Sequence, residues 1–145
     1  MQAHSRTLQP AHWPRPRGYA NGIAATGTHV AIAGQIGWND REQFETDDLV
    51  GQVRQALANV LAVLAEAGGR PEHIVRMTWY LVDKREYLTR VREIGAAYRE
   101  VMTAGGSVHY PAMSAVQVVA LMEDRAKVEI ECTAVIPPVE ERDRP

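Results

Sequence analysis

Cysteine is almost absent from this sequence, since Cys132 carries the one thiol among 145 residues. A single cysteine excludes an intrachain disulfide and is typical of a reducing compartment. Cys132 falls at an apolar position of a strand-like run. We therefore interpret it as a small buried hydrophobe and not as a nucleophile.

Long apolar runs, basic clusters and metal-ligand spacings are also missing. No run approaches the roughly 20 apolar residues of a membrane-spanning helix, and the polar residues 1–18 lack the apolar segment of a secretory signal. We therefore expect a cytoplasmic protein without a membrane partner. The formal charge of −2, without clustered Lys and Arg, predicts no nucleic-acid partner. The histidines at positions 4, 12, 29 and 73 lack ligand spacing, so we expect no metal and no cofactor.

What is present is the composition of an ordinary globular protein, with 46% hydrophobic and 23% charged residues. The length suits one domain and is short for two. We expect an irregular lead-in over residues 1–17, a single domain over residues 18–137 and a charged, frayed tail over residues 138–145.

Hydrophobic periodicity predicts the order β-β-α-β-α-β-β, an α+β fold. The first two strands, which we expect to pair as a hairpin, are followed by alternating helices and strands; the expected elements are strands 19–26 and 28–36, a helix from Thr46 or Asp47 to Gly68, strand 74–82, helix 84–102 and strands 112–118 and 127–135. One mixed sheet would carry both helices on one face. The other face, left to water or to a partner, favours oligomerisation.

The last predicted strand carries two carboxylates that do not point into the core. Glu129 and Glu131 alternate with Val128, Ile130 and Cys132, so they point to the face opposite the apolar set. We expect them to meet solvent, a cleft or another subunit. Glu129 is the stronger candidate for a site residue, while Glu131 is expected to pair across an interface or to meet water.

Two motifs near the C-terminus resemble those of the RidA (YjgF) family. They are Pro-Ala-x-Ser-x-Val-x-Val over residues 111–118 and Val-Glu-Ile-Glu-x-x-Ala-Val over residues 128–135, and weaker marks lie at residues 18–20, 33–37 and 55–59. The resemblance implies a chorismate-mutase-like fold and a homotrimer with its sites between subunits. It also implies a small-molecule substrate: family members hydrolyse imines and enamines to a carbonyl product and ammonia.

The resemblance further implies roles for individual residues. Glu129 would hold the attacking water, the backbone of Gly34 and Ala115 would bind polar atoms of the substrate, and Tyr19 would close the pocket. Met113, however, stands where the family has the arginine that binds the substrate carboxylate, and a methionine cannot neutralise a carboxylate. We hypothesise that Arg92, on the second helix, supplies the cation, although a solvated Arg92 is the alternative.

Two functions follow from this replacement. The first is a divergent RidA-like hydrolase in which Met113 and Trp38 accommodate a bulkier or aminomuconate-type imine or enamine, with weak activity on 2-iminopropanoate. The second is a non-catalytic protein that uses the same cleft between subunits to bind a small metabolite or to dock a partner. A ribonuclease activity has no support in the charge balance or in base-stacking motifs.

Overall fold

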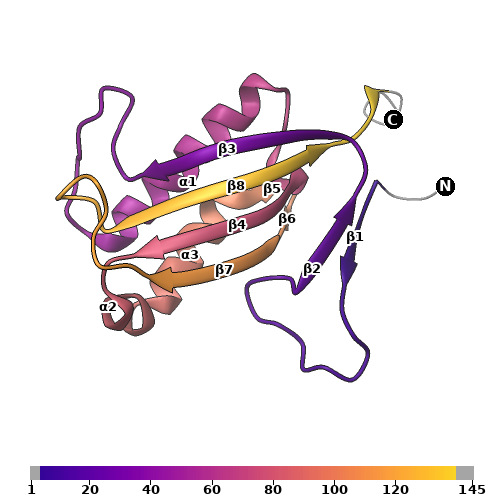
Figure 1. Cartoon of the computed structure of the whole chain (residues 1–145), viewed down its shortest axis with the longest axis horizontal. Coiled ribbons are helices and arrows are strands. Elements are labelled where there is room, and N and C mark those ends of the chain that lie inside the picture. Colours follow the sequence, from indigo (N-terminus) through magenta and orange to yellow (C-terminus); the bar gives the residue numbers. More distant parts are fainter. Residues whose placement is uncertain (1–3, 140–145) are drawn as a thin grey trace.

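The protein, described here by a computed structural model over residues 4–139, has an α+β fold. A four-stranded sheet lies in front of the helices in Figure 1, and its strands follow the order β3-β8-β4-β7. These strands are β3 (Thr28–Ile36), β4 (Ile74–Leu81), β7 (Ala112–Gln117) and β8 (Val128–Ile136). β8 is antiparallel to both neighbours, whereas β4 and β7 run parallel. The sheet is therefore mixed, as the sequence predicts.

Helix α1 (Leu49–Glu66) begins at Asp48, where the carboxylate accepts a hydrogen bond from the backbone N–H of Gly51. Its apolar stripe includes Val53, Leu57 and Val60, each with no exposed surface. The chain leaves the helix through Gly68, whose φ of 77° favours glycine. The predicted start and end of this helix thus lie within a few residues of the observed ones.

The second predicted helix, 84–102, is two helices, α2 (Lys84–Thr89) and α3 (Val91–Met102). Arg90 lies between them with a φ of −109° and a ψ of 21°. Its guanidinium pairs with Asp48 and, at 2.6 Å, with Glu93. This break starts α3 afresh at Val91, and α3 then packs beside α1 behind the sheet.

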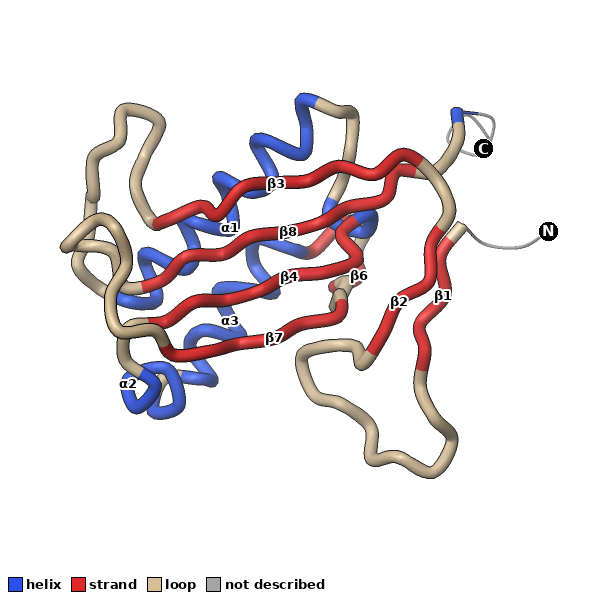
Figure 2. Tube along the Cα trace, viewed as in Figure 1, coloured by secondary structure: helices blue, strands red, loops and turns tan. Residues whose placement is uncertain are grey.

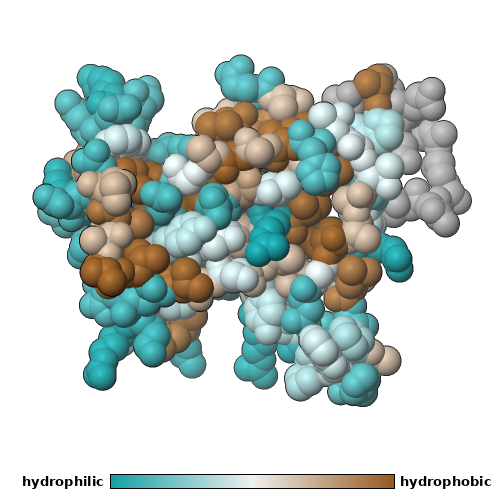
Figure 3. Space-filling model, viewed as in Figure 1, coloured by the Kyte–Doolittle hydropathy of each residue, from teal (hydrophilic) through white to brown (hydrophobic). Residues whose placement is uncertain are grey.

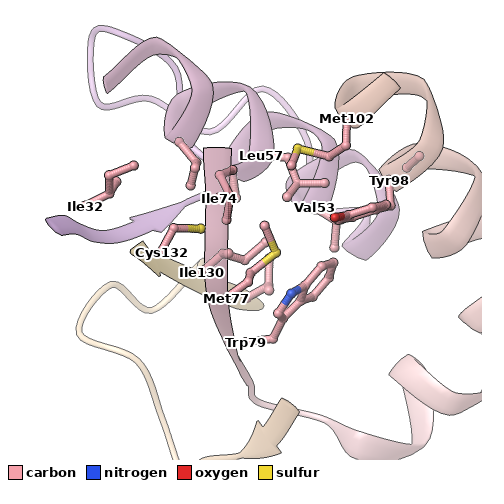
Figure 4. Close-up of a cluster of buried hydrophobic side chains, with 14 of the residues drawn as sticks. Ile32, Val53, Leu57, Ile74, Met77, Trp79, Tyr98, Met102, Ile130 and Cys132 are labelled. Carbon is pink, nitrogen blue, oxygen red and sulfur yellow. The ribbon is translucent and has the colours of Figure 1, made fainter. Parts of the chain in front are cut away.

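The core lies between the sheet and these helices (Figure 4). Met77, Trp79 and Ile130 project into it from the sheet, and Leu57 meets them from α1. Cys132 is 4% exposed in the same cluster, which confirms that it is a buried hydrophobe. A Leu→Ala change at such a position costs about 2–5 kcal/mol.

The N-terminal residues differ from the prediction in two ways. Part of the expected irregular lead-in forms strand β1 (Ser5–Leu8), and β1 pairs with β2 (Gly22–Ala25) in a separate hairpin. The expected pairing of β2 with β3 is wrong, because β2 pairs with β1 and β3 pairs with β8. Figure 2 shows the hairpin and its long loop beside the start of β7.

The remaining elements are short. They are the 3-10 turn η1 (Pro71–His73) and the two-residue strands β5 (Thr103–Ala104) and β6 (Ser107–Val108). None of the helices within residues 4–139 is long and apolar enough to cross a membrane. Most of the predicted charged tail, residues 140–145, lies outside the described residues.

The face of the sheet away from the helices is mixed in character (Figure 3). Arg76, Thr78 and Tyr80 line it from β4, and Glu129 and Glu131 line it from β8. Apolar atoms gather where β7 ends and the next loop begins. The exposed apolar side chains there are Val116, Val119 and Met122.

Candidate functional site

A cavity of about 420 Å³ lies on the helix side of the sheet, at its β7 edge. Its walls come from the N-terminal loop, β4, β7 and the helices, and the lining residues are Arg17, Gly18, Tyr19, Trp79, Tyr87, Val91, Ile94, Gly95, Tyr98, Arg99, Tyr110, Met113 and Ala115. The size falls in the range of small-molecule sites. Three of the predicted site residues, Tyr19, Met113 and Ala115, thus share one cavity.

Backbone pairing brings the N-terminal loop to this cavity. The N–H of Ala20 donates to the carbonyl of Pro111 at 2.9 Å, and Ala20 bridges to Ala112 in parallel fashion. Gly18 turns the chain just before, with a φ of 75° that favours glycine. Tyr19 is thereby placed at the mouth, 42% exposed.

Aromatic rings form the floor and walls. Tyr98 and Tyr110 are stacked with centroids 5.4 Å apart, and Trp79 meets the edge of Tyr87 at 6.3 Å. The Tyr98 hydroxyl donates to the carbonyl of His109 at 2.8 Å. Burial raises the pKa of both Tyr87 and Tyr98. These tyrosines are neutral at physiological pH and offer rings and hydroxyls, not charge.

Among residues 4–139, the charged residues that line the cavity are Arg17 and Arg99, and no carboxylate lines it. Neither arginine forms an ion pair with a residue in the described range 4–139. The two guanidinium groups are therefore not paired with a carboxylate in this part of the chain and are available to bind an anion.

Glu129 and Gly34 lie together elsewhere, on the open face of the sheet. A Cβ added at Gly34 would stand 2.3 Å from Oε2 of Glu129, so the carboxylate rests against the backbone of β3. A side chain at position 34 would have to displace it. The two residues that the sequence expected to act together are thus in contact.

Glu129 has a polar neighbourhood on that face. Tyr80 stands opposite Glu129 in the pairing of β4 with β8, and its hydroxyl donates to Oε1 of Glu131 at 2.5 Å. That hydrogen bond raises the pKa of Tyr80. Glu131, expected at an interface or in water, has found a partner within its own chain.

The predicted site residues therefore form two groups on opposite sides of one sheet. Met113 and Ala115 alternate on β7 with residues of the open face and point to the helices, whereas Glu129 points away from them. A four-stranded sheet separates the two groups within one chain. They can act on one molecule only where two chains meet.

Arg92 belongs to neither group. It is exposed in the first turn of α3 and does not line the cavity. Val91, Gly95 and Arg99 recur every four residues and share the face that does. Arg92 lies about 100° around the helix from Val91. The geometry thus favours the solvated alternative for Arg92, and the cavity's cations are the unforeseen Arg17 and Arg99.

Trp38 also lies apart from Met113. It lines a second cavity, of about 570 Å³, between the loop before α1 and the loop before β8. Phe44 packs beside it at 5.9 Å, and the guanidinium of Arg125 covers the Phe44 ring at 5.3 Å. The expectation that Trp38 and Met113 shape one pocket is not met within a single chain.

No cluster of metal-binding side chains occurs within residues 4–139.

Fold and cavity together define a small α+β protein with a cavity lined by arginines and aromatic rings at a sheet edge. The profile of the family described as Endoribonuclease L-PSP matches residues 13–136. The chain belongs to this family, whose members also carry the names RidA, YjgF and RutC. The resemblance stated from the motifs is confirmed.

Two curated relatives cover nearly the whole chain. One is the 2-iminobutanoate/2-iminopropanoate deaminase of Salmonella typhimurium, 32% identical over 132 residues that span 90% of this chain and 98% of the relative. The other is a RutC family protein of Synechocystis, 36% identical over 135 residues, or 91% and 97% of the two chains.

Solved structures agree on the fold. A Rid family protein of unknown function from Yersinia pestis matches with a TM-score of 0.79 and 28% identity, over 92% of this chain and all of that one. The YjgF protein of E. coli matches with a TM-score of 0.64 and 31% identity, over 90% and 98% of the two chains. The α+β, chorismate-mutase-like fold predicted from the sequence is confirmed.

Proposed function

We propose that this protein is an imine or enamine hydrolase that converts a C=N substrate to a carbonyl product and ammonia. The relatives named as 2-iminobutanoate/2-iminopropanoate deaminases support this reaction class. The observation that carries it is the contact of Glu129 with the Gly34 backbone on a face that also bears Tyr80. A carboxylate fixed against a strand is suited to hold and deprotonate a water molecule.

The reaction balances with one water. Glu129 accepts a proton as the water oxygen adds to the imine carbon, and the nitrogen takes up a proton. Glu129 then gives its proton to the nitrogen of the carbinolamine, ammonia leaves, and the hydroxyl proton returns to solvent as the carbonyl group forms. An enamine first takes a proton on carbon to become the imine.

The working site requires an assembly. Because the cavity and Glu129 lie on opposite sides of the sheet, the cavity of one subunit must meet the partner subunit's Glu129. The exposed apolar residues after β7, Val119 and Met122, suit a buried contact between subunits. A homotrimer supplies such a site at each of its interfaces. Sedimentation at micromolar concentration tests this, and a monomer would contradict it.

The direct test is ammonia release from imines generated in situ by an amino-acid oxidase. Glu129→Gln should abolish release and leave the trimer intact. Glu131→Gln is the matched control: it removes the same charge from the same face, from a carboxylate already bound by Tyr80. It should retain activity. Unchanged turnover in Glu129→Gln would refute the assignment.

A second function is favoured by Met113. The methionine lies in the cavity at the strand position where the sequence motif leads one to expect a cation. A binding protein without turnover would need the cavity and its arginines but not Glu129. Saturable binding of a carboxylic acid, with no ammonia released from any imine, would select this alternative.

A further inference from the structure

Within residues 4–139, the indole N–H of Trp79 has no hydrogen-bond partner. Its side chain is 4% exposed and lines the 420 Å³ cavity, and Nε1 is buried without a hydrogen bond. Figure 4 shows Trp79 projecting from β4 into the space between sheet and helices. A buried donor left unpaired is costly, so its persistence needs an explanation. A ligand acceptor atom inside the cavity would provide one.

Gly95 supplies an independent observation. It stands inside α3, where glycine is less favourable than alanine. A Cβ at this position would meet no backbone of another element; within 4 Å it would touch Nη1 of Arg99 alone, at 3.3 Å. The missing side chain therefore leaves room in front of the Arg99 guanidinium, in the cavity wall.

The rest of the wall determines what such a ligand looks like. Stacked Tyr98 and Tyr110, with Trp79 and Tyr87, present flat apolar surfaces, and Met113 adds a polarisable one. Arg17 and Arg99 supply the charge. A three-carbon acid would satisfy an arginine but would leave most of the 420 Å³ cavity unfilled.

We infer that the cavity binds a carboxylic acid with an aromatic body, its carboxylate held by Arg99 and Arg17, its ring among the aromatic side chains, and an oxygen accepting from Trp79 Nε1. As a substrate, the ligand would be an aryl-substituted 2-imino acid, and its product would be the matching 2-oxo acid. The naming of a substrate rests on the proposed function. The binding claim does not.

The test is calorimetric titration of the full-length protein with phenylpyruvate, pyruvate and muconate, with no turnover required. Phenylpyruvate should bind at least about tenfold tighter than pyruvate, because its ring is removed from water. Equal affinities would overturn the inference. Tighter binding of muconate than of phenylpyruvate would also overturn it, since two carboxylates and no ring would then be the better fit.

Three variants assign the contacts. Arg99→Gln should weaken phenylpyruvate binding by roughly tenfold or more, and Arg85→Gln, an exposed arginine away from the cavity, is the charge-matched control. Gly95→Ala should weaken binding while the Tm stays the same or rises, since alanine favours the helix. Trp79→Phe should also weaken binding, because it removes the unpaired donor and keeps a ring, while the smaller buried ring lowers the Tm. Unchanged affinity in all three would contradict the inference.

Failure of this inference and failure of the proposed function are distinguishable. If phenylpyruvate binds with this pattern but no imine releases ammonia, the pocket is assigned correctly and the protein is not a hydrolase. If small imines are hydrolysed with Glu129 dependence while phenylpyruvate does not bind, the hydrolase stands and the inference is wrong.

Discussion

Glu129 rests on the backbone of Gly34: a Cβ at position 34 would lie 2.3 Å from Oε2 of the glutamate. This contact between β8 and β3 fixes the carboxylate on the open face of the sheet. It is the relationship on which the proposed water activation depends.

Gly34→Ala should therefore disable Glu129 without removing it. Because the methyl group and the carboxylate cannot share the same space, we expect ammonia release to fall by at least about tenfold and stability to fall by about 1–3 kcal/mol. The rate and the urea midpoint measure the two effects. In a Glu129→Gln background the same change should not lower the residual rate further, and an independent, multiplicative loss would show that Gly34 does not act through Glu129.

The sequence alone predicts which face of the sheet Glu129 occupies, but it does not predict the contact of Glu129 with Gly34. Period-two alternation around Ile130 is enough to place Glu129 and Glu131 opposite the core. The neighbour of Glu129 could be predicted only through the family resemblance, because pairing of β3 with β8 joins residues almost a hundred positions apart. The incorrect prediction of a hairpin between β2 and β3 has the same cause, because the true partner of β3 is the distant strand β8. A four-residue strand within a polar lead-in leaves no periodic signal from which β1 could be predicted.

The arginines show where helix phase matters. The face of α3 that holds Val91, Ile94 and Tyr98 is predictable from spacing, and Arg99 belongs to it as the eighth residue after Val91. The hypothesis for Arg92 starts from the missing arginine at position 113, and the spacing places Arg92 outside that face. Arg17 has no sequence signal, because its position depends on the tertiary bridge between Ala20 and Ala112.

Replacing Arg99 or Arg92 with glutamine tests which of these two α3 arginines binds the substrate carboxylate. Arg99→Gln should raise the KM for an aryl-substituted imine by roughly tenfold, since a charge-assisted contact is lost. Arg92→Gln should change it by less than about twofold, as expected for a solvated charge. The opposite order of effects, read from initial rates of ammonia release, would restore the sequence-based hypothesis.

Met113→Arg should change the preference of the pocket. The new guanidinium would occupy part of the cavity and hold a carboxylate nearer to β7, so activity on 2-iminopropanoate should rise and activity on a bulky imine should fall. The ratio of the two kcat/KM values is the measurement. Met113→Leu, which keeps an apolar side chain, is the control and should leave the ratio near that of the natural protein. Unchanged activity on both substrates in the arginine variant would show that the cavity is not the substrate site.

Cys132 should be inert in the folded protein. Burial raises the pKa of its thiol to about 12 from an ordinary 9.0, so the neutral form is favoured in the folded state. The stability that this contributes is fully present below pH 9.0 and is lost as the pH rises towards 12. Thiol labelling at pH 8 should follow global unfolding, and Cys132→Ala should flatten the fall in stability above pH 9. Fast labelling of the native protein would contradict the burial.

The central claim is that each site combines the cavity of one subunit with the partner subunit's Glu129, and subunit mixing tests it most directly. Ala115→Trp should block the cavity from an exposed strand position, and Glu129→Gln should remove the base, so each variant alone should be inactive. Equal amounts, unfolded and refolded together, should give about a quarter of the natural activity, because random trimers place an open cavity against an intact Glu129 at one interface in four. Activity that stays at zero, in trimers shown to contain both variants, would contradict the account.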